Sequence, residues 1–160
     1  MKRLLLLRHA HAEDARSGIA DIDRPLSPRG RAEALEAAQR IASARVRCDA
    51  LLVSPALRTR ETASIVAAQL DIAARPRLDA TLYLADADTL LSALHHGGGL
   101  ARTLLLVAHN PGISELAQRF RPKPAPVELK TAGMCLVSFA SKTDWRELQP
   151  ELATAFKLLA

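Results

Sequence analysis

Residues 3–14 read RLLLLRHAHAED, and this stretch decides how the chain folds. Four consecutive leucines are too short a run for a helix core, a membrane span or the hydrophobic region of a signal peptide, but they suit a strand buried on both faces. We therefore expect Leu4–Leu7 to be a central strand of a parallel sheet, and we expect the protein to be cytoplasmic. Arg8 and His9 would then lie at the carboxyl end of that strand.

The rest of the chain alternates between short apolar runs and longer segments with helical spacing. Two pairs, Ser27-Pro28 and Ser54-Pro55, are typical of helix N-termini, and the first helix should bury Leu35, Ala38 and Ile41. The predicted strands are 51–53, 77–78, 103–107, 134–139 and a last one near 145–148; the predicted helices are 28–44, 54–70, 85–94 and 112–120, followed by a proline-rich loop at 121–133. This alternation predicts a three-layer α/β/α sandwich around a mostly parallel central sheet.

Length and composition narrow the classes of function. The chain has 160 residues, which suits one domain spanning 1–160, and a formal net charge of +5 carried mostly by arginine. Such a charge favours an anionic substrate, but the arginines are scattered and aromatic residues are few, so we expect no nucleic-acid partner. Cys48 and Cys135 lack metal-site spacing and should be reduced and structural. We expect no membrane partner and, because no apolar stripe is left over, a monomer.

Three of the predicted strands end in short segments that carry charge: LLLLRHAHA, LLVSPALRTRET and LLLVAHNPG. The carboxyl ends of strands in an open α/β sheet converge on one crevice, so side chains far apart in sequence can meet there. Two arginines and two histidines would form this cluster: Arg8, His9, Arg58 and His109. Arginines can neutralise phosphoryl oxygens and an imidazole can attack phosphorus, so the cluster suits phosphoryl chemistry.

The ordered triple of RH after the first strand, S-P-x-x-R after the second and H-N-P-G after a later one resembles the histidine phosphatase (phosphoglycerate mutase-like) superfamily. The short length and the segments DRPLSPRG and LYLAD look like the SixA-type protein phosphohistidine phosphatases. The resemblance implies a phosphoglycerate mutase-like fold and an enzyme that needs neither metal nor other cofactor. It implies that His9 is the nucleophile and becomes a phosphohistidine, while the phosphoryl group is bound by Arg8, Arg58 and His109.

This sequence departs from the family pattern where the usual RHG followed by Glu reads RHAHA. Ala10 replaces a glycine, which is tolerable if its φ is negative, and His11 replaces an acid. His11, Arg24 and Asn110 are candidates for the mouth of the site.

A general acid is less obvious. Asp79 is the best candidate to protonate a leaving oxygen, with Glu13 or Asp14 less suitable. An imidazole leaving group has a pKa of about 6.5 and departs with little help, so the lack of an obvious acid favours phosphoramidate substrates.

Several alternatives stay open. His9-x-His11 with the acids that follow could be a metal site, although the HxHxDH pattern of metallo-β-lactamases is absent. The main hypothesis is a phosphatase acting on a phosphohistidine-bearing protein. The second is a phosphomonoesterase or mutase acting on small phosphorylated substrates, and the third is a module that binds phosphoproteins without turnover.

Overall fold

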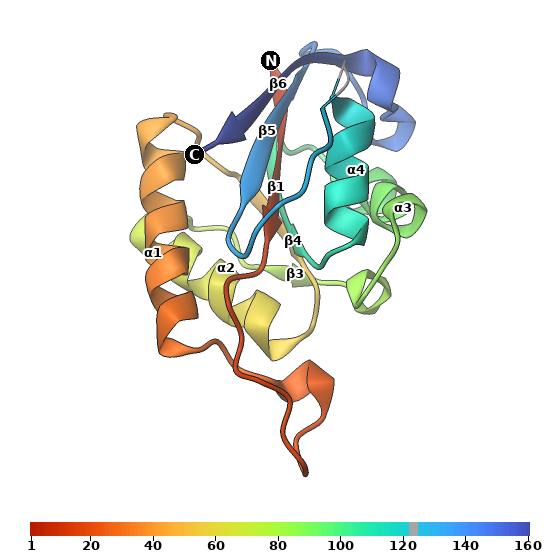
Figure 1. Cartoon of the computed structure of the whole chain (residues 1–160). Coiled ribbons are helices and arrows are strands. Elements are labelled where there is room, and N and C mark those ends of the chain that lie inside the picture. Colours follow the sequence, from red (N-terminus) through yellow and green to blue (C-terminus); the bar gives the residue numbers. More distant parts are fainter. Residues whose placement is uncertain (122–124) are drawn as a thin grey trace.

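A six-stranded mixed sheet forms the centre of the protein, in the order β3-β2-β4-β1-β5-β6 (Figure 1). The computed structural model describes residues 1–121 and 125–160. The strands are β1 (Lys2–Arg8), β2 (Ala50–Val53), β3 (Arg77–Leu78), β4 (Thr103–Ala108), β5 (Met134–Phe139) and β6 (Ala153–Leu159). β1 to β4 are parallel, β5 pairs antiparallel with β1, and β6 pairs antiparallel with β5 at the edge of the sheet. The predicted mostly parallel sheet is therefore confirmed.

Two helices cover each face of this sheet. α1 (Pro28–Ser43) and α2 (Leu57–Gln69) lie on one side, and α3 (Ala87–Gly97) and α4 (Gly112–Phe120) on the other (Figure 1). Successive side chains of a strand point to opposite faces, so β1 divides its leucines between the two cores. Leu5 and Leu7 pack with α1 and α2, whereas Leu4 and Leu6 pack with α3 and α4. This arrangement is the predicted α/β/α sandwich.

α1 begins where the sequence predicts, because the Ser27 hydroxyl accepts a hydrogen bond from the Gly30 N–H at 3.0 Å. The prediction that Leu35 is buried is wrong, since 44% of this residue is exposed. Two successive three-residue steps place Leu35 about 120° around the helix from Ile41. The buried face instead includes Ala34, Ala38 and Ile41.

The predicted start of the second helix is also wrong. α2 begins at Leu57, and Ser54 is no cap because its N–H donates to the Val107 carbonyl and extends the pairing of β2 with β4. α3 begins at Ala87, where the Asp86 carboxylate accepts from the Thr89 N–H, and it continues to Gly97 beyond the predicted end.

The C-terminal strand lies later than predicted. Residues 145–147 form a 3₁₀ helix, because the Asp144 carboxylate caps the Arg146 N–H and the Trp145 indole donates to the Ala101 carbonyl. The strand that completes the sheet is β6. Residues 122–124 of the predicted loop lie outside the described residues, and its other residues form neither helix nor strand. Among the helices of the described ranges, none has the length and apolar character needed to cross a membrane.

Candidate active site

The carboxyl ends of β1 and β4 bring two histidines together. The register pairs Arg8 with Ala108, so the residues that follow, His9 and His109, leave the sheet side by side. The His9 N–H donates to the Ala108 carbonyl at 3.1 Å, and the two ring centroids lie 5.3 Å apart. The predicted convergence of these histidines is what the strand register produces.

Two arginines lie with them. Arg58, in the first turn of α2, is only 2% exposed, and its Nη2 lies 3.4 Å from His109 Nδ1. Arg8 ends β1, and its Nη1 donates to the Leu129 carbonyl at 3.0 Å. The Nε atoms of both arginines are buried, and neither has a hydrogen-bond partner among the described residues. Arg40 Nε, outside this cluster, is buried without a partner among the same residues as well, so the cluster suits an oxyanion because of the permanent charge of its two guanidinium groups.

His9 is held in one tautomer. Its Nδ1 lies 2.7 Å from the Ala10 carbonyl oxygen. A carbonyl only accepts, so Nδ1 carries the proton and Nε2 keeps a lone pair. Burial, with the positive charges of Arg58 and Arg8, lowers the pKa of His9 to about 4. At neutral pH the ring is therefore an uncharged imidazole with a free Nε2, the form that can act as a nucleophile.

His109 is fixed from two sides. Its Nε2 lies 2.7 Å from the Ser54 hydroxyl oxygen, and the Tyr83 ring packs edge-on against it at 5.6 Å between centroids. Burial, followed by the nearby His9 and Arg58, lowers the pKa of His109 to about 3. Because the Arg58 guanidinium can only donate, the Nδ1 that faces it is an acceptor and Nε2–H donates to Ser54.

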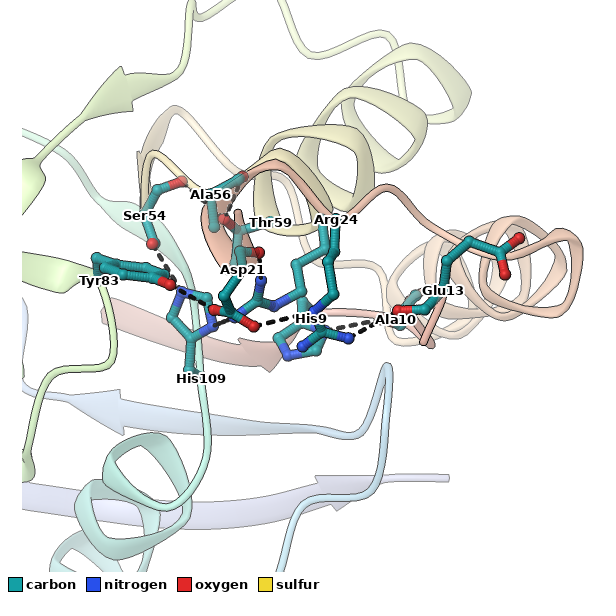
Figure 2. A network of polar contacts seen from close by, with 11 residues as sticks. His9, Ala10, Glu13, Asp21, Arg24, Ser54, Ala56, Thr59, Tyr83 and His109 are labelled. Atoms are coloured by element: carbon teal, nitrogen blue, oxygen red, sulfur yellow. Dashed lines mark hydrogen bonds and ion pairs between the residues drawn. The ribbon is translucent and has the colours of Figure 1, made fainter. Parts of the chain in front are cut away.

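A carboxylate, Asp21, lies within this cationic cluster (Figure 2). Its Oδ2 accepts from Arg58 Nη2 at 3.1 Å and from the Tyr83 hydroxyl, and its Oδ1 accepts from Arg24 Nε at 2.9 Å. The Asp21 backbone carbonyl accepts from Arg58 Nη1 at 2.8 Å. Hydrogen bonds from Tyr83 and the two arginines hold the pKa of the Asp21 carboxyl well below its usual range.

Ser54, Tyr83 and Asp21 are the residues that sequence reasoning missed as parts of this site. Ser54 follows a strand directly, which is the same signal that selected His9. Asp21 stands three residues before Arg24 and pairs with it, an arrangement visible in the sequence. Tyr83 lies in the LYLAD segment that resembles the SixA-type phosphatases, but no local pattern places it beside His109, because only the path of the β3–α3 connection brings it here.

The predicted residues of the mouth have different places. Arg24 belongs to the cluster, and its Nη1 also donates to the Glu13 carbonyl. His11 faces α1, with its Nδ1 2.7 Å from the Ser27 hydroxyl, and its N–H donates to a Glu33 carboxylate oxygen at 2.8 Å. This histidine therefore joins the loop to the helix.

Asn110 orders the loops beside the site. Its side chain donates to the Leu129 carbonyl and accepts from the Ser114 hydroxyl. Asp79 caps the 3₁₀ helix Ala80–Leu82 by accepting from the N–H and hydroxyl of Thr81. No hydrogen bond of the described residues links Asp79 to either histidine, so its role as general acid stays a prediction.

The part of the chain that the structure describes contains no candidate metal centre. Within residues 1–121 and 125–160, no three His, Cys, Asp or Glu side chains are grouped so that they could hold a metal ion. In particular, His9 and His11 are engaged by different partners, the Ala10 carbonyl and the Ser27 hydroxyl.

Comparison with known proteins identifies the family of this site. The family model of the histidine phosphatase superfamily (branch 1) matches residues 4–83, half of the 160-residue chain, and includes Arg8, His9 and Arg58. This chain belongs to the histidine phosphatase superfamily. His109 lies beyond the matched residues of this histidine phosphatase, and the strand register brings it to the others.

Curated relatives extend over most of this histidine phosphatase. An uncharacterized chloroplastic protein of Arabidopsis thaliana is 32% identical over 155 residues, which is 91% of this chain and 70% of the relative. An uncharacterized protein of Mycobacterium leprae is 31% identical over 163 residues, which is 92% of this chain and 94% of the relative.

Solved structures show that this histidine phosphatase is of the SixA type. A SixA protein from Agrobacterium tumefaciens is 29% identical with a TM-score of 0.76, covering 85% of this chain and 91% of its own. A SixA protein from Nakamurella multipartitia is 26% identical with a TM-score of 0.79, covering 98% and 92%. Both solved structures thus share the fold of this histidine phosphatase over most of their length.

The departure from the family pattern at Ala10 is accommodated by the fold of this histidine phosphatase. Ala10 is not among the residues with positive φ, it is fully buried, and its N–H donates to the Thr62 hydroxyl at 3.0 Å. A methyl group at negative φ costs no backbone strain, so alanine serves where the family usually has glycine.

Proposed function

We propose that this histidine phosphatase removes the phosphoryl group from phosphohistidine in a protein, through a covalent phosphohistidine formed on His9. One observation carries the proposal. His9 presents an unprotonated Nε2 beside His109, in a cluster that carries the permanent positive charges of Arg8 and Arg58. These groups have the chemistry needed to hold a phosphoryl group against a nucleophile.

In the first step the lone pair of His9 Nε2 attacks phosphorus and the bond to the leaving group breaks. The hydrogen bond from Nδ1 to the Ala10 carbonyl remains through the step and stabilises the positive charge that develops on the ring. Arg58 and Arg8 bind the equatorial oxygens, whose charge is stabilised as the transition state forms. When a phosphoryl oxygen replaces Arg58 at His109 Nδ1, the ring proton moves to Nδ1 and is donated to that oxygen, and the Ser54 hydroxyl donates to Nε2 instead.

In the second step water attacks the phosphorus of phospho-His9. The P–N bond breaks and its electron pair returns to Nε2, so that His9 is again neutral with its proton on Nδ1. Both protons of the water stay with the product as dihydrogen phosphate, which balances the charge. The second step therefore needs no group other than those that bind the phosphoryl group.

The choice of phosphohistidine as substrate rests on leaving-group chemistry. An alkoxide must be protonated as it leaves, whereas an imidazole needs no such help. Asp21 is ionised, and Asp79 is engaged with Thr81, so neither favours the ester reaction. The likeness to SixA proteins, one of which is described as the protein histidine phosphatase SixA, supports the same choice of substrate.

The experiment is a trapping assay with a protein that carries ³²P on histidine. We expect release of inorganic phosphate and an acid-labile, alkali-stable label on the phosphatase, with both signals abolished in His9→Ala. Phosphoserine and sugar phosphates should be turned over much more slowly. Faster turnover of esters would indicate a small-molecule phosphomonoesterase. Binding of the phosphoprotein without release, unchanged in His9→Ala, would indicate a binding module and overturn the proposal.

A further inference from the structure

We propose that Asp21 determines specificity at the leaving-group side of the site: it favours substrates whose phosphoryl group is bonded to a protonated nitrogen ring over substrates whose leaving group is an alkoxide. This inference rests on the proposed function, and it names the class of substrate that the same site prefers.

Asp21 and His109 both contact the same atom, Nη2 of Arg58. Arg58 Nη2 lies 3.1 Å from Asp21 Oδ2 and 3.4 Å from His109 Nδ1. A phosphoryl group bound by this nitrogen and by His109 is therefore a near neighbour of the carboxylate. In the view of Figure 2, the Asp21 carboxylate lies between the rings of His9 and His109.

Asp21 keeps the capacity to bind a further donor. Its Oδ2 accepts two hydrogen bonds, whereas Oδ1 accepts only the one from Arg24 within the described residues. A carboxylate oxygen can accept two. The Asp21 side chain is 45% exposed, so a substrate that enters from solvent can reach this carboxylate. An N–H on the leaving group would donate the second hydrogen bond to Asp21 Oδ1.

The chemistry of a phosphorylated imidazole uses such an acceptor. When the ring nitrogen that does not carry phosphorus is protonated, the substrate ring is cationic. Attack by His9 Nε2 breaks the P–N bond, whose electron pair stays on the ring nitrogen, and the substrate leaves as neutral imidazole with its proton still in place. His9 takes on the charge that the substrate ring loses. Asp21 would keep that proton on the leaving ring without donating one itself.

An ester places the opposite demand on the same position. Its leaving oxygen gains negative charge as the P–O bond breaks, and an ionised carboxylate nearby opposes that charge. Arg24 and Arg58 offset part of this effect because both are paired with Asp21. Removing Arg24 should therefore strengthen the preference for a cationic leaving group, and neutralising Asp21 should weaken it.

The test compares two substrates that differ only in the reacting bond: a peptide with phosphohistidine and the same peptide with phosphoserine. The measured quantity is the ratio of kcat/KM for the two. We expect this ratio to fall about tenfold or more in Asp21→Asn and to rise about threefold or more in Arg24→Gln. Asp144→Asn, the same chemical change at a carboxylate that caps the 3₁₀ helix Trp145–Glu147, is the matched control and should change the ratio by less than a factor of two.

The outcomes separate this inference from the proposed function. Equal losses for both peptides in Asp21→Asn would mean that Asp21 only positions Arg58, and this would overturn the inference. If Asp21→Asn does not fold, Arg24→Gln decides alone, since an unchanged or lower ratio contradicts the inference. If the unsubstituted protein dephosphorylates phosphohistidine through His9 and neither ratio changes, the proposed function stands without this inference. If it releases no phosphate from phosphohistidine, both are wrong.

Discussion

The rings of His9 and His109 lie 5.3 Å apart because β1 and β4 are parallel neighbours in register. Each histidine directly follows the last paired residue of its strand, Arg8 in β1 and Ala108 in β4. A shift of one residue in this register would turn one of the two side chains to the other face of the sheet. The fully buried leucines of both strands, which pack on helices on either face, make that shift unfavourable.

Replacing Arg58 should remove transition-state stabilisation. We expect kcat/KM for a phosphohistidine peptide to fall about 100-fold or more in Arg58→Ala, because a buried, charged donor beside His109 is lost. Arg58→Lys keeps the positive charge but loses the planar guanidinium that donates two parallel hydrogen bonds. Its activity should lie between those of Arg58→Ala and the unsubstituted protein. The control is Arg60→Ala, which removes an exposed arginine two residues further along α2. Similar losses in the two alanine variants would contradict a role for Arg58 in binding the phosphoryl group.

Ser54 should act by positioning His109. In Ser54→Ala the Nε2 of His109 loses its partner at 2.7 Å, so we expect about a tenfold loss of kcat and a change in the ¹⁵N shifts of the ring. The comparison is Ser27→Ala, which removes the hydroxyl that contacts His11 and caps α1. Loss of the cap should cost about 1 kcal/mol of stability. Unchanged ring shifts in Ser54→Ala would show that this hydroxyl does not orient His109.

Much of the sheet, and the convergence of the two arginines and two histidines, could be predicted from the sequence. The central strands are short, almost wholly apolar and followed at once by polar residues, so their positions and buried faces are clear. The sequence does not predict β6, because ATAFKLL mixes small residues and one lysine with apolar residues and most of it is exposed, as is usual for a strand at the edge of a sheet.

The acidic part of the site could not be predicted for a different reason. Asp21 begins the 3₁₀ helix Asp21–Asp23 in the connection from β1 to α1, whose path is set by tertiary contacts such as the hydrogen bond from the Leu26 N–H to the Glu61 carboxylate at 2.6 Å. Tyr83 reaches Asp21 from another connection. The Ser54-Pro55 pair predicts a helix cap at Ser54, but the Ser54 hydroxyl has His109 as its partner instead. Local sequence patterns do not determine which of several polar groups a side chain contacts in the folded protein.

Gly30 should be essential for the packing of α1 against the loop that carries His9. A Cβ at this position would lie 1.9 Å from the His11 carbonyl oxygen, so either the helix or the loop must move. We expect Gly30→Ala to lower the free energy of unfolding by about 2 kcal/mol or more, although alanine is the better helix former. The measurement is urea unfolding. The control is Ala32→Gly, an exposed position of α1 where propensity alone costs up to about 1 kcal/mol. A stabilised Gly30→Ala would contradict the close approach.

The two histidines should make the stability of the protein depend on pH. The unfolded chain takes up protons at histidine near pH 6.5, whereas the pKa values in the folded protein are about 4 for His9 and about 3 for His109. Between those values the unfolded state binds more protons, so lowering the pH favours unfolding. The contribution of the buried neutral rings is thus fully present above pH 6.5 and is lost as the pH falls towards 4.

His9→Asn isolates the part of this dependence that is due to His9. Asparagine can still donate to the Ala10 carbonyl but does not titrate. Between pH 6 and 5, we expect the unsubstituted protein to lose about 1 kcal/mol more unfolding free energy than the variant. Carboxylates with lowered pKa values, such as Asp21, also lose stability in acid, but they are present in both proteins and cancel in the difference. Parallel curves of unfolding free energy against pH would show that His9 titrates normally, and the uncharged nucleophile would then lose its physical basis.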